Sequence, residues 1–250
     1  MRRRMAATAV IATPSGNSYP KTMNWDHINF WIFDLDNTLY PPEAGLFAQI
    51  ETRMTAWVMR ETGLPHDAAD RLRADYWRRH GTTLAGLMAE RHIDPDAYLA
   101  EVHDIDFSVL RPDPALAAAI AALPGRKIVH TNADAAYAAK VLAHRGLPGF
   151  DAIWGIAETG YHPKPDQRSY AAILHAEGYD PTRAAMFEDD HRNLSIPHRM
   201  GMQTVLIGPG RHGPDALPPD HDHGSDVDFH SHDLTGFLTT LALTGADVAE

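Results

Sequence analysis

Short apolar runs recur along the chain and predict five buried β-strands. The first, at residues 28–33, is almost unbroken and contains aromatic side chains, which is typical of a strand covered on both faces. Four more runs of this kind occupy residues 126–130, 151–154, 184–187 and 203–207. Helical stretches that each end at a glycine, the usual C-terminal stop of a helix, occupy residues 133–145, 166–177 and 191–200. This alternation of strand and helix predicts an α/β fold, with a parallel β-sheet flanked by helices.

The interval between the first two predicted strands breaks the alternation. It holds no convincing strand, and its pattern instead indicates four helices at residues 43–62, 66–80, 82–92 and 95–103. A structureless loop of this length is implausible inside a compact domain. We therefore expect an inserted α-helical cap at residues 43–108. The core would consist of residues 25–42 and 109–245 and would end in a short helix at residues 234–243.

Two other segments carry weaker patterns. Residues 1–24 begin with an arginine run and a short apolar stretch that faintly imitates a signal peptide, but a segment rich in Pro, Gly, Ser and Asn follows. We expect a disordered N-terminal extension here, with Met23 as an alternative start. The chain from Gly208 to Asp228 is rich in Gly, Pro, His and Asp and predicts a surface loop. The spacing of a four-ligand zinc site is missing from the histidines in and near it, His212, His221, His223, His230 and His232.

Composition and charge narrow the range of partners. The 250-residue chain has a formal net charge of −11, which argues against a general affinity for nucleic acid or an anionic membrane. No apolar run approaches the ~18 residues of a membrane span. The chain has no cysteine, which excludes disulfides, thiolate metal sites and a thiol nucleophile. We expect no nucleic-acid polymer and no membrane as partner, and a cytoplasmic location, although a cysteine-free chain folds in either redox setting.

Two aspartates, Asp34 and Asp36, directly follow the first predicted strand. Ligands of a parallel sheet bind beyond the carboxyl ends of the strands, so both side chains are well placed for a site. In an extended stretch, residues two apart share a face, which predicts that the two carboxylates lie together while Leu35 points away. Carboxylates held close repel each other, and a hard divalent cation relieves the repulsion. The alternative is a structural turn, which the Asp-Asn-Thr sequence at 36–38 also favours.

Two later segments carry groups suited to a phosphate. Thr131 and Asn132 stand where the second strand ends and a helix opens, and a hydroxyl with free backbone N–H groups at a helix start can hold a phosphate. The alternative for this pair is a simple N-cap. Lys164 lies between Pro163 and Pro165, which restrict the backbone on both sides. This suits a point charge aimed at a phosphate and a carboxylate, the alternative being a solvated surface lysine.

Three adjacent acids, Glu188, Asp189 and Asp190, follow the fourth predicted strand. Such a group is costly without a cation, and Mg²⁺ is commonly held by carboxylates in this setting. The alternative is a solvated acidic turn that leads into the next helix, because acids also favour a helix N-terminus. Asn193 follows one turn later, within reach of the same site.

Together these motifs resemble the four-motif pattern of the haloacid dehalogenase (HAD) superfamily. They occur in the family's order, as Asp-x-Asp-x-Thr at residues 34–38, Thr131-Asn132, Lys164 and Glu188-Asp189. The match spans residues 28–207, and the insertion after the first motif is similar to the family's type C1 helical cap. The resemblance implies a Rossmann-like core and an Mg²⁺-dependent hydrolase.

The resemblance also implies a role for each residue. Asp34 would attack phosphorus to form an aspartyl-phosphate, and Asp36 would protonate the leaving alkoxide and then activate water. Lys164 would stabilise the charge on phosphoryl oxygens that are bound by Thr131 and Asn132. Mg²⁺ would be held by the carboxylates of Asp34 and Asp189 and the main-chain carbonyl of Asp36. Support would come from Thr38, Glu188, Asp190 and Asn193.

The resemblance narrows the reaction further. Haloacid dehalogenases lack an acid two residues after the nucleophile, so Asp36 favours phosphate chemistry. Phosphonatases use a lysine of the cap, and residues 43–110 contain none. Several stretches resemble the pyrimidine 5′-nucleotidase branch, namely residues 34–41, 80–87, 103–107 and 187–190 with Asn193. This implies a small phosphorylated metabolite as substrate, such as UMP or CMP. The alternatives are a phosphatase of a sugar phosphate or phosphoglycolate, and a non-catalytic phosphate-binding or phosphoacceptor regulator.

Overall fold

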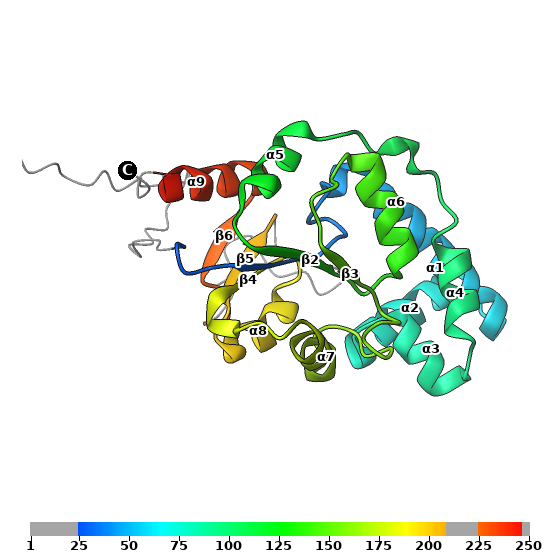
Figure 1. Cartoon of the computed structure of the whole chain (residues 1–250). Coiled ribbons are helices and arrows are strands. Elements are labelled where there is room, and N and C mark those ends of the chain that lie inside the picture. Colours follow the sequence, from blue (N-terminus) through cyan, green and yellow to red (C-terminus); the bar gives the residue numbers. More distant parts are fainter. Residues whose placement is uncertain (1–24, 209–224, 247–250) are drawn as a thin grey trace, which may run out of the picture.

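A six-stranded parallel sheet lies at the centre of the computed structural model, which describes residues 25–208 and 225–246 (Figure 1). The strand order is β3-β2-β1-β4-β5-β6, and each neighbouring pair is parallel. The strands are β1 (Phe30–Phe33), β2 (Arg126–His130), β3 (Ala152–Trp154), β4 (Ala184–Glu188), β5 (Gln203–Ile207) and β6 (Phe229–Ser231). The predicted α/β fold with a parallel, Rossmann-like sheet is confirmed.

The five predicted strands are present, with ends shifted by at most two residues, but β6 was not predicted. It is only three residues long, pairs with β5 alone and follows a polar segment, so it offers too few positions to show a strand period. His230, which lies near the predicted surface loop, is part of β6, and its Nε2 lies 2.6 Å from the carbonyl oxygen of Gly208.

Side chains of β1 alternate between two apolar cores, one on each face of the sheet. Trp31 and Phe33 pack with residues of α5 (Pro114–Ala122), α6 (Ala135–Arg145) and α9 (Leu234–Ala246). Phe30 and Ile32 pack with residues of α7 (Gln167–Glu177) and α8 (Ser195–Met200). Figure 1 shows these two groups of helices on opposite sides of the sheet. All four β1 side chains are buried, which explains the unbroken apolar run in the sequence.

Two helical regions differ from the prediction. Helix α5 was not predicted, because its Ala-rich sequence shows little contrast between an apolar and a polar face; Asp113 caps its start, with its side chain accepting from Leu116 N. The helix predicted at residues 191–200 divides into a 3₁₀ turn, η4 (His191–Leu194), and α8. Two more 3₁₀ turns, η1 (Pro42–Ala44) and η2 (Phe107–Val109), flank the inserted helices, and η3 (Pro181–Arg183) precedes β4.

The interval after β1 forms the expected helical insertion. Its helices are α1 (Leu46–Thr62), α2 (His66–His80), α3 (Thr83–Arg91) and α4 (Pro95–Val102), and they gather beside α6 in Figure 1. Packing inside the insertion is close: a Cβ added at Gly86 would lie 2.4 Å from the ring of Tyr76. The domain boundaries proposed from the sequence, 42/43 and 108/109, stay a prediction.

Tyr98 gives a test of packing within the insertion. Its side chain is buried, and its hydroxyl has no hydrogen-bond partner among the described residues. Because an unsatisfied buried hydroxyl carries a desolvation cost, Tyr98→Phe is expected to raise the free energy of unfolding by about 1 kcal/mol. Urea denaturation followed by circular dichroism measures this change. A loss of stability of the same size would show that the hydroxyl has a partner in solution.

The remaining expectations concern residues 1–24, the predicted surface loop and membrane association. The predicted extension at residues 1–24 and residues 209–224 of the predicted loop lie outside the described residues. Among the helices that the structure describes, none combines the length and the apolar character needed to cross a membrane.

Candidate active site

The candidate site lies at the carboxyl ends of three adjacent strands. Asp34 follows β1, Thr131 follows β2 and Glu188 ends β4, with β1 in the middle. The chain leaves β1 for β2 on one side and returns on the other side at β4. Such a reversal of strand order opens a crevice at the carboxyl edge, where ligands of open α/β sheets bind. The sheet therefore brings together acids that are more than 150 positions apart in the sequence.

Lys164 is the cation of this site, and its side chain is 1% exposed. Its Nζ donates to Asp34 Oδ1 at 2.6 Å, to Glu188 Oε2 at 2.6 Å and to the carbonyl oxygen of His130 at 2.8 Å. Burial by itself would lower the pKa of Lys164, but the two neighbouring carboxylates raise it above its ordinary value. The lysine is therefore a fixed, buried positive charge, and the alternative of a solvated surface lysine is excluded.

The side chain of Asn132 holds the lysine loop in place. Its Oδ1 accepts from the backbone N–H of Lys164 at 2.8 Å, and its Nδ2 donates to the carbonyl oxygen of Lys164 at 3.2 Å. Both ends of the amide thus bond to the backbone of one residue, which fixes where Lys164 leaves the chain. The predicted contact of Asn132 with a phosphate stays a prediction.

The expectation that Thr131 and Asn132 open a helix was wrong. Helix α6 begins at Ala135, and its N-cap is Asp134, whose side chain accepts from Tyr137 N. Thr131 lies in the turn before it, is 1% exposed, and accepts a hydrogen bond from Ala133 N at its Oγ1. The helix thus begins two residues later than the predicted start at residue 133. The sequence pattern does not distinguish such a turn from a first helical turn.

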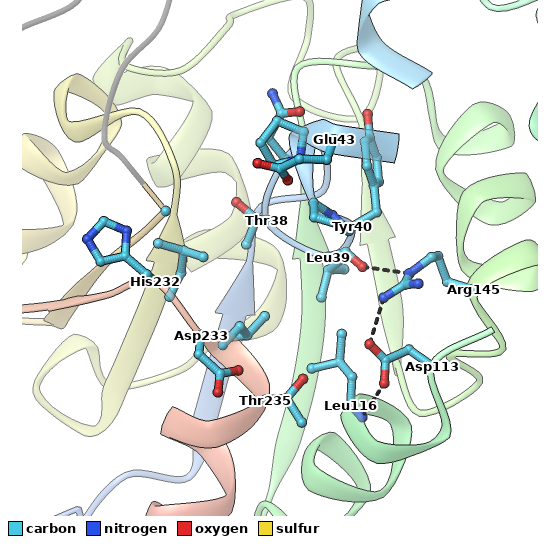
Figure 2. Close-up of a pocket in the computed structure, with 16 residues that line it drawn as sticks. Thr38, Leu39, Tyr40, Glu43, Asp113, Leu116, Arg145, His232, Asp233 and Thr235 are labelled. Atoms are coloured by element: carbon cyan, nitrogen blue, oxygen red, sulfur yellow. Dashed lines mark hydrogen bonds and ion pairs between the residues drawn. The ribbon is translucent and has the colours of Figure 1, made fainter. Parts of the chain in front are cut away.

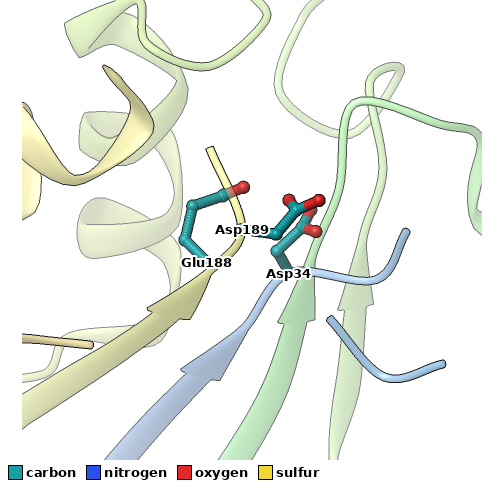
Figure 3. Close-up of side chains that lie close together, drawn as sticks. All are labelled: Asp34, Glu188 and Asp189. Carbon is teal, nitrogen blue, oxygen red and sulfur yellow. The ribbon is translucent and has the colours of Figure 1, made fainter. Parts of the chain in front are cut away.

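Three acids form a compact cluster at the same edge. Asp34, Glu188 and Asp189 each offer a carboxylate oxygen, and these oxygens lie within 4.8 Å of one another. Figure 3 shows the three side chains beyond the ends of β1 and β4. All three residues are buried. If all three acids were ionised, three negative charges would face the positive charge of Lys164 in a buried, low-dielectric setting.

Burial and the neighbouring carboxylates shift the pKa values of Asp34 and Glu188. Burial raises the pKa of Asp34 to about 7; Lys164 opposes the shift, and Asp189 and Asp36 add to it. Burial also raises the pKa of Glu188 well above its usual range, and the nearby Asp34 adds to that shift. A hard divalent cation relieves such repulsion, and an all-oxygen donor set suits Mg²⁺. The residues present therefore fit a magnesium site.

The other residues expected to support the site have varied surroundings. Thr38 donates from Oγ1 to Asp34 Oδ2 at 3.1 Å, so the threonine of the first motif orients the first aspartate. Asp190 caps η4 and pairs with Arg192 Nη2 at 2.5 Å. Asn193 is buried, and its Oδ1 has no hydrogen-bond partner in the described part of the chain.

Asp36 follows Asp34 by two positions and lies at the start of a turn. A turn begins at Asp36, where Leu39 N donates to Leu35 O at 2.9 Å and Asn37 adopts a left-handed φ of 61°. The turn that the sequence offered as the alternative is therefore present, and it coexists with the acid cluster. The Asp36 carboxylate accepts hydrogen bonds from Tyr40 and Tyr137, whose hydroxyls both lie 2.6 Å from Oδ1.

These two tyrosines were not identified from the sequence. Tyr137 lies 101 positions from Asp36, and no local pattern connects the two. His103 was missed as well; its ring stacks on Tyr137 with centroids 4.2 Å apart, and its Nδ1 lies 2.5 Å from Asp134 Oδ2. The available signal was that Tyr40 and His103 fall inside stretches that resemble the nucleotidase branch.

Arg145 was also not identified from the sequence, and its side chain contacts the backbone of the turn that begins at Asp36. Its guanidinium donates to the carbonyl oxygen of Leu39 at 3.1 Å, to Arg111 O, and to Asp113 Oδ2 at 2.8 Å. Figure 2 shows this arginine at the wall of a cavity of about 350 Å³ that also borders Thr38. The clustered acids do not line this cavity. Arg145 thus links the backbone just after the first motif to Arg111 and Asp113.

The helical insertion contacts the core close to the acid cluster. A Cβ added at Gly81, in the turn between α2 and α3, would lie 3.3 Å from the carbonyl oxygen of Lys164. The guanidinium of Arg192 lies 3.4 Å from the ring centre of Trp77 in α2. Tyr161 donates to Asp96 Oδ1 at 2.6 Å across the same boundary. The insertion therefore packs directly on the loops that carry Lys164 and Asp190.

Comparisons with known proteins agree with this architecture. Residues 31–201 match the family model of the haloacid dehalogenase-like hydrolases. Similar solved structures include the L-2-haloacid dehalogenase PA0810 (21% identity, TM-score 0.56, 86% of this chain and 99% of that chain). They also include the HAD phosphatase from Thermococcus onnurineus (16% identity, TM-score 0.54, 86% of this chain and 98% of that chain). A third is the magnesium-bound HAD-hydrolase YfnB from Bacillus subtilis (15% identity, TM-score 0.50, 86% of this chain and 98% of that chain). At these identities the similarity establishes the fold, while the family model covers most of the chain. The chain belongs to the haloacid dehalogenase-like hydrolase family.

Proposed function

We propose that this hydrolase is an Mg²⁺-dependent phosphatase that cleaves a small phosphate monoester through an aspartyl-phosphate on Asp34. The observation that carries the proposal is the buried cluster in which Asp34 contacts Lys164 Nζ at 2.6 Å beside Glu188 and Asp189. A second aspartate, Asp36, stands at the same edge of the sheet and influences the pKa of Asp34. This arrangement offers a nucleophile, a cation-binding group and a candidate acid together.

The metal would be held by the carboxylates of Asp34 and Asp189 and the main-chain carbonyl of Asp36. When bound, the cation supplies positive charge that neutralises the phosphoryl oxygens and lowers the proton affinity of the neighbouring carboxylates. Lys164 contributes a second positive charge from a position fixed by Asn132. Such preorganised charges act strongly in a buried site because no solvent has to reorganise around them.

The residues of the chain account for each proton and bond of the reaction. A carboxylate oxygen of Asp34 attacks phosphorus, the bond between phosphorus and the leaving oxygen breaks, and Asp36 transfers its proton to that oxygen. Asp36 then accepts a proton from water as the water oxygen attacks the aspartyl-phosphate. The bond from phosphorus to Asp34 breaks, phosphate departs, and both aspartates return to their starting states.

Dehalogenation is the second candidate, because several similar solved structures are L-2-haloacid dehalogenases. A halide leaves without a proton, so that reaction has no use for an acid beside the nucleophile. An alkoxide needs a proton as it leaves, and in this proposal Asp36 supplies it. Repulsion within the buried acid cluster also favours a site that works with a cation. Both features support phosphate chemistry.

For the substrate we propose a pyrimidine nucleoside 5′-monophosphate such as UMP or CMP, on the resemblance of the motif stretches to the nucleotidase branch. The segment from Tyr76 to Gly86 is where the insertion approaches the site, since its Gly81 packs against Lys164. Tyr76 itself is fully buried in the insertion, so base recognition would fall to its neighbours. A sugar phosphate or phosphoglycolate remains the alternative substrate.

A substrate panel tests both levels of this proposal. Phosphate release is measured with UMP, CMP, a hexose phosphate, phosphoglycolate and p-nitrophenyl phosphate, in Mg²⁺ and in EDTA. Chloride release from 2-chloropropionate is measured in parallel. We expect hydrolysis that requires Mg²⁺, with the highest kcat/KM for UMP or CMP. Chloride release in EDTA without phosphate release would overturn the phosphatase, whereas preference for a sugar phosphate would overturn only the nucleotide assignment.

A further inference from the structure

Two tyrosine hydroxyls converge on a single oxygen of Asp36. Tyr40 and Tyr137 each donate to Oδ1 at 2.6 Å, and the two hydroxyl oxygens lie 3.4 Å apart. Both phenols are buried, and each hydroxyl donates its proton to the carboxylate oxygen. Because Oδ1 is occupied twice, Oδ2 is the oxygen available to carry a transferable proton.

The donor from Tyr137 is held by a second layer of contacts. Its ring stacks on His103 at 4.2 Å with an interplanar angle of 15°. His103 Nδ1 in turn lies 2.5 Å from Asp134 Oδ2, and the other oxygen of Asp134 accepts from Tyr137 N at 2.7 Å. The tyrosine is thus fixed both through its ring and through its backbone.

We propose that Tyr40 and Tyr137 are positioning residues that fix the rotation of the Asp36 carboxyl group so that Oδ2 faces the leaving-group oxygen. The inference rests on the proposed function, in which Asp36 is the general acid. A carboxyl group free to rotate presents its proton in the productive direction only part of the time, and small errors in orientation reduce a rate substantially. The substrates that depend on this fixed orientation of Asp36 are phosphate esters of poorly acidic alcohols, such as nucleosides and sugars.

Leaving-group dependence separates this role from a merely structural one. Tyr40→Phe and Tyr137→Phe each remove one donor and keep the ring. The value of kcat/KM, which covers the steps up to aspartyl-phosphate formation, is measured over a series of alkyl and aryl phosphates. General acid catalysis is worth roughly 10² to 10⁴-fold, so losing one donor is expected to lower kcat/KM about tenfold for alkyl phosphates. The loss for p-nitrophenyl phosphate should stay under about threefold, because nitrophenolate leaves without a proton.

The matched control is Tyr98→Phe, which makes the same chemical change at a buried tyrosine of the insertion away from Asp36. It should keep the wild-type dependence on leaving-group pKa. Asp36→Asn serves as the reference for complete loss of the acid and should give the steepest dependence. If Asp36→Asn steepens the dependence and neither tyrosine variant does, the positioning role is overturned and the phosphatase stands. If Asp36→Asn leaves the dependence unchanged, the acid role in the proposed function fails, and the positioning role fails with it.

Discussion

Replacing Asp34 by asparagine is expected to abolish phosphate release while stabilising the metal-free protein at neutral pH. An amide cannot form the aspartyl-phosphate, so turnover should fall by at least about 10⁴-fold, as is typical when a nucleophile is removed. Phosphate release from the best substrate of the panel measures this loss. The exposed Asp104, whose side chain is 82% exposed, provides the matched control as Asp104→Asn. Undiminished Mg²⁺-dependent hydrolysis by Asp34→Asn would exclude the proposed nucleophile.

The gain in stability follows from the raised pKa of Asp34, about 7 in the folded chain against an ordinary value of 3.8. At pH values below the ordinary pKa the group is protonated in both states and costs nothing. As pH rises toward 7, the unfolded chain releases the proton more readily than the folded chain, so stability falls, and the full penalty applies above pH 7. Asparagine avoids this penalty, which amounts to as much as about 4 kcal/mol at roughly 1.4 kcal/mol per pKa unit.

Urea denaturation in EDTA at pH 4 and at pH 8 measures the difference. Asp34→Asn should match the wild type near pH 4 and exceed it at pH 8. Equal stability at pH 8 would contradict the account of Asp34 as a strained, buried carboxylate. Such a result would leave the loss of turnover as an independent test of the nucleophile.

Replacing Lys164 by methionine is expected to impair both stability and turnover. Removing one partner of a buried ion pair costs about 3–5 kcal/mol, because the other partner stays buried without its counter-charge. Here two carboxylates, Asp34 and Glu188, lose their contacts at 2.6 Å, and the carbonyl oxygen of His130 loses a donor. Turnover should fall by roughly 10² to 10³-fold, the usual effect of losing one stabilising charge or donor.

Lys140→Met is the matched control for this substitution, because Lys140 is exposed on α6 and lies 5.7 Å from the ring centre of Phe107. Unfolding in urea and phosphate release are measured for both variants. The defect of Lys164→Met should be smallest at acidic pH, where Asp34 and Glu188 take up protons and their repulsion disappears. A variant as stable and active as the wild type would show that Lys164 does not carry the charge balance of the site.

The sequence was sufficient to locate the acids because parallel strands end at a common edge. Asp34 and Glu188 follow two predicted strands, β1 and β4, which placed both acids at the carboxyl edge of the sheet. That the two acids are neighbours along this edge follows from the pairing of β1 with β4, which the structure shows. The local conformation of each motif was harder to predict from the sequence. A turn begins at Asp36, and its backbone is held by contacts of Leu35 O with Leu39 N and of Arg145 Nε with Leu39 O. The Arg145 contact joins residues 106 positions apart, so no local pattern could indicate it.

Contacts of side chains with residues far away in the sequence could not be predicted from a single sequence. Asn132 and Lys164 are 32 positions apart, and nothing near either residue indicates that an amide bonds to the backbone of the other loop. The contact of Tyr137 with Asp36 spans three times that separation. Such pairings depend on how helices settle on the sheet, and that packing is decided by the volumes of the whole core.

Gly81 has a consequence for any effort to change the substrate of this enzyme. Its φ of 85° disfavours other residues, and the carbonyl oxygen of Lys164 leaves little room for a side chain there. A library that varied the whole turn between α2 and α3 would therefore yield many variants with a displaced lysine and no activity, whatever their fit to a new substrate. Keeping position 81 constant while varying its neighbours would let selectivity be explored without disturbing the charge that the chemistry needs.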